Sequence, residues 1–337
     1  MNIVNSKSLV KYNTFKVNVT ADFFTNIQNE EELLVLLNDK KFHHQEKLIL
    51  GGGSNILFTK NISGLVIHNN IRGIKIQKET NNSMFLEIGA GESWDKLVQW
   101  TTEKGLYGLE NLSLIPGYVG AAPIQNIGAY GVELKDIFEK LTAINIKNRK
   151  TYIFNKSDCL FGYRNSIFKN ELKNQFIITK IQIKLSKKQA LNLSYKGLMS
   201  QIEKFHISKL TSQDIRKIII KIRNSKLPNP EFIGNAGSFF KNPIINKNSL
   251  NQLQKKYPEI PFFKSDKNIK IPAGWLIEKL NWKGYQNDTC GVYKKHSLVL
   301  VNYGNSTGKD IMMLARKIKK DVHKNFNILL EEEVSIL

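Results

Sequence analysis

The sequence predicts a mixed fold of α-helices and short β-strands, divided into more than one domain. The chain has 337 residues, of which 41% are hydrophobic and 23% are charged, so it can bury the cores of two or three globular domains. Apolar runs with the spacing of strands alternate with runs that have helical spacing. Three loops rich in glycine and other small residues interrupt these runs, and we expect a ligand to bind there.

The first predicted elements are a helix and a series of strands. Asn29 is expected to be the N-cap of a helix, with Glu32 at the capping-box position and further acids in the first turn. The strands expected after it are short and apolar, and they cover residues 48–50, 56–58, 65–68, 74–77 and 84–88.

A segment that begins like a dinucleotide fingerprint follows these strands. It reads Gly89-Ala90-Gly91-Glu92-Ser93-Trp94, and Trp94 stands where the third glycine would be. We therefore do not expect a Rossmann site. The segment is interpreted as a turn in which Ser93 caps a helix that ends at Gly105.

The second half of the chain continues the mixed pattern. Strands are expected at 141–146, 151–154, 176–185 and 298–302, and helices at 212–223, from 271 onward and at 308–324. The segment Lys226-Leu227-Pro228-Asn229-Pro230 ends the helix before it and indicates a domain junction. Residues 328–337 have a strand pattern interrupted by three glutamates. They form either a solvated edge strand or, because adjacent strand residues face opposite ways, a strand with at least one inward carboxylate.

Two of the small-residue loops are candidates for holding phosphate. The central loop, residues 115–131, contains four glycines and almost no charge, and the amides of Gln125 and Asn126 add directional hydrogen-bonding groups. The first glycine loop, Gly51-Gly52-Gly53-Ser54-Asn55, lies between two apolar strands. Two such loops in one chain indicate a long ligand with a diphosphate.

Charge and cysteine content limit the classes of function. The formal net charge is +21, but the lysines are spread along the chain and form no arginine-rich block. Nucleic-acid binding would need basic and aromatic residues interleaved on one surface, so we expect instead a positive field that attracts anionic substrates. Cys159 and Cys290 match no zinc or redox spacing, and no metal is expected. No apolar run approaches the roughly 18 residues of a membrane span, and the N-terminal residues lack the apolar core of a signal peptide, which favours a cytoplasmic protein.

Two polar residues stand out as candidates for chemistry. Arg164 follows an aromatic residue and precedes an amide, and it is either a ligand for an anionic group or a surface arginine in a turn. Ser238 lies in the third small-residue loop, residues 234–243. It is no acyl nucleophile of the Gly-x-Ser-x-Gly type, because Phe240 replaces the second glycine. Ser238 is interpreted as a proton donor or ligand contact, with a capping serine as the alternative.

Five segments in order resemble one enzyme family. They are Gly-Gly-Gly-Ser-Asn, the central Ile-Pro-Gly to Gly-Ala-Tyr-Gly stretch, Phe-Gly-Tyr-Arg, Gly-Asn-Ala-Gly-Ser-Phe-Phe-Lys-Asn-Pro and the terminal Leu-Glu-Glu-Glu-Val. Together they resemble the family of UDP-N-acetylenolpyruvoylglucosamine reductases, nearly end to end. The segment around Tyr195 resembles the family's first subtype. Glu332 departs from the pattern, since proline is expected there in many members.

The resemblance implies a fold and a reaction. The fold is α+β with three domains. Residues 1–70 and 71–211 form a non-Rossmann FAD-binding unit of the vanillyl-alcohol oxidase type, and residues 212–337 form a substrate-binding domain. NADPH reduces FAD, and flavin N5 then passes hydride to the enolpyruvyl group of UDP-N-acetylglucosamine enolpyruvate. The product is UDP-N-acetylmuramate, a precursor of peptidoglycan. We expect a monomer that binds no nucleic acid and does not insert into a membrane.

The resemblance also assigns roles to residues. Arg164 would stabilise the enolate that forms on hydride addition, Ser238 would donate the proton, and Glu333 would assist as acid or by polarising the enol. The residues that would contact the UDP-sugar are Tyr130, Tyr163, Tyr195, Lys226 and Asn242. The residues that would hold FAD are Gly51, Gly52, Gly53, Ser54, Asn55, Pro116, Gly117, Gly120, Ala121, Gln125, Asn126, Gly128 and Ala129.

The main alternative within enzymes is another flavin oxidoreductase of the same fold that acts on an alcohol or a sugar. Such enzymes often attach the flavin through histidine or cysteine. The two glycine loops contain neither residue.

Overall fold

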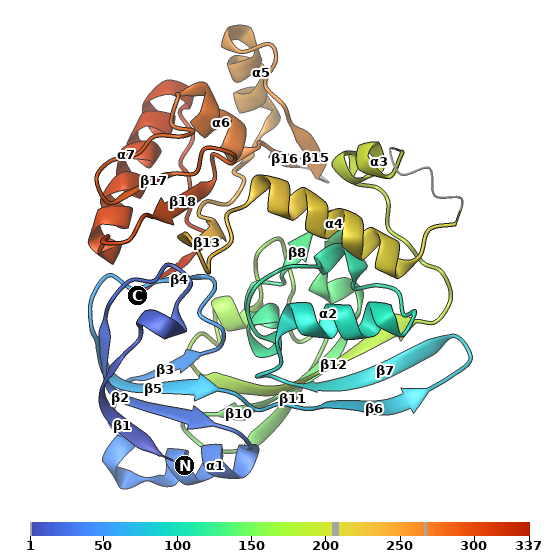
Figure 1. The fold of residues 1–337 in the computed structure, drawn as a ribbon, viewed down its shortest axis with the longest axis vertical. Helices are drawn as coiled ribbons and strands as arrows, with labels where there is room; N and C mark the ends of the chain where they lie inside the picture. Colours follow the sequence, from blue (N-terminus) through green and yellow to red (C-terminus); the bar gives the residue numbers. More distant parts are fainter. Residues whose placement is uncertain (1, 204–208, 266–267) are drawn as a thin grey trace. The chain divides into compact units, whose positions relative to one another are not determined.

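The computed structural model describes residues 2–203, 209–265 and 268–337, which form two compact units. Unit 1 comprises Met1–Lys7, Thr20–Gly52 and Ile62–Arg223, and unit 2 comprises Ser8–Val19, Gly53–Asn61 and Asn224–Leu337 (Figure 1). The first glycine loop is therefore divided between the units after Gly52. The expected domain boundaries after residues 70 and 211 stay a prediction.

Unit 1 begins with a four-stranded sheet in the order β1-β2-β5-β3. Its strands are β1 (Ile3–Ser8), β2 (Thr20–Ile27), β3 (Lys47–Leu50) and β5 (Ile62–Asn69). The central strand β5 pairs in parallel with β2 and β3. Helix α1 (Glu30–Asn38) buries Leu33, Leu36 and Leu37 against this sheet, because these leucines share one helical face.

The start of α1 confirms one expectation and corrects another. The Asn29 side chain accepts the N–H of Glu32 at 2.8 Å, as predicted for an N-cap. The Glu32 carboxylate accepts the N–H of Gln28 at 2.9 Å, one residue before the cap. The predicted capping box is thus not closed on Asn29 itself.

The second sheet of unit 1 is antiparallel, with the order β11-β10-β12-β7-β6. Its strands are β6 (Ile74–Glu79), β7 (Ser83–Gly89), β10 (Phe138–Asn145), β11 (Thr151–Asn155) and β12 (Phe176–Ser186). Helix α2 (Trp94–Glu103) packs Trp94, Leu97 and Val98 into the core of this sheet. All five strands lie where apolar runs predicted strands or directly continue them.

Ser93 occupies the N-cap position of α2, as predicted. Its side chain makes no capping hydrogen bond, so the predicted capping interaction is wrong. The central loop supplies the missing partner. The N–H of Trp94 donates to the Gly117 carbonyl at 3.0 Å, and Ser93 forms a β-bridge with Tyr118. The predicted end at Gly105 is confirmed, since this glycine has a φ of +67° directly after the last turn.

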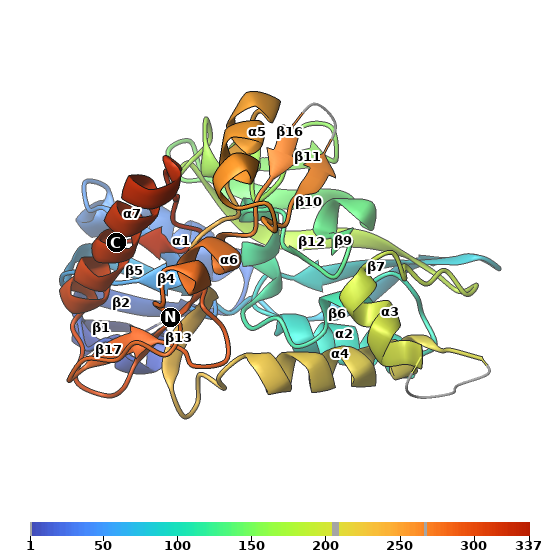
Figure 2. The same ribbon diagram turned by 90° about the horizontal axis from the view of Figure 1, so that it is seen from above.

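Helix α4 (Ser212–Lys226), which belongs to unit 1 as far as Arg223, runs beside α2, as both Figure 1 and Figure 2 show. It ends before the predicted Leu-Pro-Asn-Pro break. Its isoleucines pack against the short helix α3 (Lys196–Ile202) in a small separate core, to which Tyr130 of the central loop also contributes. Helix α4 therefore connects the central loop to the segment around Tyr195.

Among its described residues, unit 2 contains small sheets and the α-helices α5, α6 and α7. One antiparallel sheet has the order β13-β18-β17, formed by Gly234–Ser238, Val299–Asn302 and Cys290–Val292. Another has the order β14-β16-β15, formed by Ile244–Ile245, Asn268–Lys270 and Phe263–Ser265. The helices are α5 (Lys247–Lys256), α6 (Ala273–Lys279) and α7 (Gly308–Phe326). The predicted helix over 308–324 is confirmed by α7, and one of its faces, formed by Ile311, Leu314, Ala315, Ile318 and Val322, is buried.

The C-terminal segment differs from the predicted strand over 328–337. Only β19 (Ser335–Ile336) is a regular strand, and it pairs in parallel with β4 (Ile56–Leu57). Before it, the backbone pairs instead with the residues after β13: Lys241 N–H donates to the Glu331 carbonyl at 2.9 Å, and Glu333 N–H to the Phe239 carbonyl at 2.8 Å. Backbone partners distant in the sequence determine this segment, so the local alternation misled the prediction.

Candidate functional site

Gly51 and Gly52 of the first glycine loop lie against the central loop within unit 1. A Cβ added to Gly52 would lie 2.9 Å from the Cα of Gly117, which is closer than side chains approach a backbone. A Cβ at Gly51 would meet the Cβ of Tyr118 at 3.5 Å, an ordinary contact. The absence of a side chain at Gly52 therefore lets two backbones come together, and this gives the loops a surface of peptide groups.

The segment Gly89–Trp94 holds the central loop in place through backbone hydrogen bonds. The N–H of Gly120 donates to the Ala90 carbonyl at 2.8 Å, and the N–H of Val119 donates to the Glu92 carbonyl at 2.9 Å. The Trp94 indole N–H donates to the Leu112 carbonyl at 3.0 Å. A segment that resembles a dinucleotide fingerprint thus serves here as the platform for another loop.

Asn126 is fully buried and fixes the second half of the central loop. Its Nδ2 donates to Glu133 at 3.0 Å and to the Gly162 carbonyl at 3.1 Å, and its Oδ1 accepts the N–H of Lys135 at 2.9 Å. Its backbone has a φ of +47°, which side chains rarely adopt. The Asn126 amide is used by the fold, so its predicted contact with the cofactor would fall to the backbone.

Arg164 lies at the tip of a tight turn that begins at Gly162. Gly162 and Asn165 exchange backbone hydrogen bonds at 3.1 and 3.2 Å, and Arg164 between them has a φ of +51°. Its guanidinium donates to the Gly128 carbonyl at 2.7 Å and lies 5.5 Å from the centre of the Tyr163 ring. Arg164 is half-buried and held against the central loop, which favours the ligand role over that of a surface arginine.

Tyr130 is held in a similarly strained turn. Its φ is +50°, and its carbonyl accepts the Nδ2 of Asn111 at 2.8 Å. The same Nδ2 donates to the Asn192 carbonyl at 2.9 Å, so Asn111 connects the central loop to the chain before Tyr195. The Tyr130 and Tyr195 rings meet edge to face with centres 5.3 Å apart. Two of the predicted substrate contacts are therefore neighbours.

Ser238 is the last residue of β13 in unit 2. It pairs with Val299, precedes no helix and thus caps none. The next two residues, Phe239 and Phe240, are buried with ring centres 5.1 Å apart. Ser238 itself is half-buried, and within the described part of the chain its hydroxyl makes no hydrogen bond. The strand ladder thus presents a partly exposed hydroxyl beside an apolar cluster.

Glu333 belongs to the same region of unit 2. Its N–H donates to the carbonyl of Phe239, the residue after Ser238. Its own carbonyl accepts the Nδ2 of Asn55 at 3.2 Å. The neighbouring carboxylates pair with lysines, Glu331 with Lys241 at 2.9 Å and Glu332 with Lys319 at 2.7 Å. The structure therefore brings together the segments of three predicted site residues, Ser238, Glu333 and Asn55.

The other two residues predicted to bind substrate also belong to unit 2. Lys226 is exposed at the end of α4. The Asn242 Oδ1 accepts the N–H of Ala273 at 3.0 Å, at the first turn of α6. The side-chain oxygen of Asn242 is therefore already engaged in a hydrogen bond to the first turn of α6. The functional roles of all the predicted site residues stay predictions.

His68 was not singled out from the sequence. It lies on β5, hydrogen-bonds Asn26 at 2.9 Å and has its ring centre 5.7 Å from that of Tyr118 in the central loop. Burial, and secondarily the nearby charge of Arg72, lower the pKa of His68 below its ordinary value. A single histidine within an apolar strand gave no signal of this contact.

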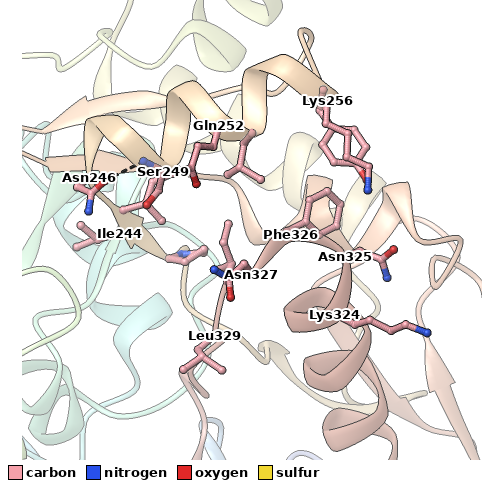
Figure 3. Close-up of a pocket in the computed structure, with 15 residues that line it drawn as sticks. Ile244, Asn246, Ser249, Gln252, Lys256, Lys324, Asn325, Phe326, Asn327 and Leu329 are labelled. Carbon is pink, nitrogen blue, oxygen red and sulfur yellow. Dashed lines mark hydrogen bonds between the residues drawn. The ribbon is translucent and has the colours of Figure 1, made fainter.

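A pocket of about 550 Å³ lies in unit 2 between α5 and the C-terminal end of α7 (Figure 3). Polar and basic side chains such as Asn246, Lys256 and Lys324 line it together with Phe326. None of the predicted site residues is among its lining residues, although Pro243 at its edge directly follows Asn242. The pocket is thus separate from the residues described above.

Comparisons with known proteins identify both parts of the chain. Residues 21–149 match the family model of an FAD binding domain, and residues 229–337 match that of the UDP-N-acetylenolpyruvoylglucosamine reductase C-terminal domain. A UDP-N-acetylenolpyruvoylglucosamine reductase from Flavobacterium johnsoniae is 46% identical, with 100% of both chains covered. One from Pseudomonas aeruginosa is 41% identical over 98% of this chain and 97% of its own.

The chain belongs to the UDP-N-acetylenolpyruvoylglucosamine reductase family. A crystal structure of the family's enzyme from Thermus caldophilus matches with a TM-score of 0.67 at 23% identity, covering 99% of this chain and 98% of that one. This similarity confirms the predicted α+β fold. Both cysteines are free and buried. Among the described helices, none is long and apolar enough to cross a membrane.

Proposed function

We propose that the chain reduces UDP-N-acetylenolpyruvoylglucosamine to UDP-N-acetylmuramate, with FAD as cofactor and NADPH as reductant. The observation that carries this proposal is the identity of 46% over the full length to a relative of that name. The chemistry that FAD supplies when bound is hydride transfer, first from NADPH and then to the enolpyruvyl double bond.

The residues present fit this cofactor. Gly52 and Gly117 bring two backbones into contact without an intervening side chain, and such loops present N–H groups to phosphates. Both glycines lie within the part of the chain that matches an FAD binding domain. We propose that these loops hold the FAD diphosphate.

Arg164 would stabilise the charge that develops on the substrate carboxylate when hydride adds to the double bond. A guanidinium suits this role because its planar fork of donors matches a carboxylate or enolate. The strained turn and the bond to Gly128 fix the guanidinium before substrate arrives, and this lowers the cost of reorganisation in the reaction.

Ser238 would then donate a proton to the carbon next to the one that accepted hydride. An alkyl hydroxyl is a weak acid, but an enolate is basic enough to take its proton when the two are well placed. Glu333, whose backbone bonds to the residue after Ser238, would assist as acid or by polarising the enol. Tyr163, Lys226 and Asn242 would contact the UDP-sugar.

The finer parts of this proposal are a cytoplasmic location and a monomeric state. The free thiols support the first part, since disulfides are rare in the cytoplasm. Light scattering of the purified protein measures the mass of the particle in solution, and a dimer's mass would contradict the second part.

The test uses the purified protein and its visible spectrum. We expect a yellow protein that releases FAD on denaturation, is bleached by NADPH without oxygen, and regains its colour when enolpyruvyl-UDP-N-acetylglucosamine is added. Mass spectrometry should find UDP-N-acetylmuramate. A colourless protein that takes up no added FAD would refute the proposal. If the protein oxidises alcohols or sugars but does not react with the enolpyruvyl substrate, the alternative oxidoreductase is favoured.

A further inference from the structure

The pocket between α5 and the C-terminal end of α7 combines basic and apolar side chains. Its volume of about 550 Å³ is that of a site for a small molecule. Figure 3 shows Lys256 and Lys324 at the same end of the pocket as Phe326, and Ile244 at the other end. Leu329, which is 71% exposed, also lines the pocket. The pocket therefore offers positive charge together with apolar side chains that solvent reaches.

The charge of the two lysines is not neutralised within the described part of the chain. No acidic residue is among the described residues that line the pocket, and no carboxylate among them forms an ion pair with either lysine. The acids nearest to the lysines in the sequence are bound elsewhere. Glu259 pairs with Lys279 at 2.8 Å, and Asp321 accepts the indole N–H of Trp282 at 3.0 Å. Charge complementarity therefore favours an anionic ligand.

Aromatic rings lie beside the lysines. The rings of Tyr257 and Phe326 have centres 4.9 Å apart, and the ammonium of Lys256 lies 5.3 Å from the centre of the Tyr257 ring. Phe326 is buried but Tyr257 is only half-buried, so the Tyr257 ring keeps a surface on which a flat ligand can pack. The amide of Gln252, which makes no hydrogen bond with the described residues, also lines the pocket. These groups suit a ligand with both a ring and an anionic group.

Two walls of the pocket continue into a backbone pairing outside it. One wall contains residues 243–245, which follow Lys241, and another contains residues 327–329, which precede Glu331. The Lys241 N–H donates to the Glu331 carbonyl at 2.9 Å, and the Glu333 N–H makes the next bond of the same pairing, at 2.8 Å. A ligand that contacts both walls would restrict their separation, and it would therefore also protect this pairing from opening.

We propose that this pocket binds a small aromatic molecule that carries a phosphate or a carboxylate, and that its binding stabilises the adjoining backbone pairing. The anionic group lies between Lys256 and Lys324, and the ring packs against Tyr257. The inference goes beyond the proposed reaction and does not depend on it, because none of the predicted site residues lines the pocket.

The first experiment titrates the FAD-loaded protein with 1-naphthyl phosphate in a calorimeter. We expect one molecule to bind per chain with a dissociation constant below about 1 mM, the order that a probe of this size reaches. 1-Naphthol lacks the anion and inorganic phosphate lacks the ring, so both should bind at least about 10-fold more weakly. Equal binding of either control would overturn the inference, as would the absence of binding by 1-naphthyl phosphate.

Charge variants test whether the probe lies in this pocket. Lys324→Gln removes a charge from the lining, and Lys317→Gln removes an equal charge from an exposed position of the same helix outside the lining. We expect the affinity for 1-naphthyl phosphate to fall by about 3- to 10-fold in Lys324→Gln, somewhat above the range for an exposed ion pair. The Lys317→Gln variant should match wild type.

A second pair of variants tests the volume of the pocket. Gln252→Trp fills the pocket and should abolish binding, whereas Asn251→Trp adds the same ring to α5 outside the lining and should not. Wild-type affinity in both Gln252→Trp and Lys324→Gln would place the probe elsewhere and overturn the inference. If Gln252→Trp fails to fold, Lys324→Gln decides.

Amide hydrogen exchange tests the link to the backbone pairing. With the probe at about ten times its dissociation constant, we expect the amides of Lys241 and Glu333 to exchange up to about 10-fold more slowly, the limit set by linkage. The probe should not change this exchange in Gln252→Trp. Unchanged exchange of both amides in the wild-type protein with bound probe would overturn this part of the inference. If the protein does not turn over the enolpyruvyl substrate, the proposed function fails, and these binding tests keep their meaning.

Discussion

Arg164 in unit 1 and Ser238 in unit 2 are positioned by different physical means. Arg164 lies at the tip of a turn with φ at +51°, and its side chain is bonded to another loop at Gly128. Ser238 ends β13, whose pairing with β18 is irregular between Asn235 and Ser238 but resumes where Ser238 pairs with Val299, and backbone bonds to the C-terminal segment fix its neighbours. One residue is held through its own side chain and a strained backbone, and the other through a ladder that does not involve its side chain.

This difference in how the two residues are held predicts which substitutions change the reaction without changing the fold. At a ladder position, the side chain can be changed without loss of any bond that holds the fold. In the loops of unit 1, side chains and close backbone approaches are themselves the structure, so substitutions should affect positioning, cofactor retention or stability as well.

Ser238→Ala should give the largest effect on the reaction with the smallest effect on the fold. We expect recolouring of the bleached enzyme by enolpyruvyl-UDP-N-acetylglucosamine to slow by about 10²–10⁴-fold, the usual share of general acid catalysis. FAD content, melting temperature and bleaching by NADPH should stay at wild-type values, because none of them needs the hydroxyl. Stopped-flow absorbance of the flavin band separates the two steps.

Ser238→Cys is the companion variant, since a thiol can also donate a proton and should recover part of the rate. Wild-type recolouring by Ser238→Ala would make Ser238 a structural residue. The acid would then be sought at Glu333.

Arg164→Met should slow the same step by about 10²-fold, the scale for losing one donor to an oxyanion. Arg164→Lys should recover little, because an ammonium lacks the planar fork that reaches both Gly128 and a substrate oxygen. The bond from Arg164 to Gly128 also supports the loop, so a modest loss of stability is expected, unlike at Ser238. Stopped-flow rates and thermal melts of both variants measure the two effects.

Equal slowing of bleaching and recolouring in Arg164→Met would show that the residue is needed for the fold of the site rather than for the enolate. Such a result would also remove the contrast with Ser238.

Gly52→Ala tests the close approach of the two glycine loops. The added Cβ would lie 2.9 Å from the Gly117 backbone, so the loops must separate, at a cost of about 1–3 kcal/mol. We expect a lower FAD-to-protein ratio after purification and a lower melting temperature. Gly51→Ala is the control from the same loop, because its Cβ meets only ordinary contacts at 3.5 Å or more. Equal FAD content in the two variants would contradict the predicted role of the approach.

The sequence predicted the elements of this site better than their arrangement. The glycine loops, the β10 and β12 strands and the face of α7 follow from local residue patterns, which act over a few positions. The contacts between Gly52 and Gly117, between Arg164 and Gly128, and between Phe239 and Glu333 join distant segments. Short-range spacing carries no information on such contacts, and the resemblance to a family supplied the roles instead.

The errors and omissions have the same cause. The end of the chain alternates like a strand, but its backbone bonds go to Phe239 and Lys241, which the local pattern could not indicate.

His68 tests the comparison between the two units through a smaller, local effect on stability. Burial and the charge of Arg72 lower its pKa in the folded state, whereas in the unfolded chain it titrates near the ordinary value of about 6.5. The unfolded state therefore binds the proton first as pH falls, so the stability that neutral His68 contributes is present above about 6.5 and is lost below it. We expect unit 1 to lose protection from amide hydrogen exchange as the pH falls below about 6.5, most clearly around β5 and Tyr118, and the melting temperature to fall with it. His68→Gln keeps a polar side chain near Asn26 but cannot titrate, and it should flatten this dependence on pH.

Because His68 lies in unit 1, the strand ladder around Ser238 should keep its protection over the same range of pH. Equal loss in both units, or the same pH dependence in His68→Gln, would show that other groups control the acid response.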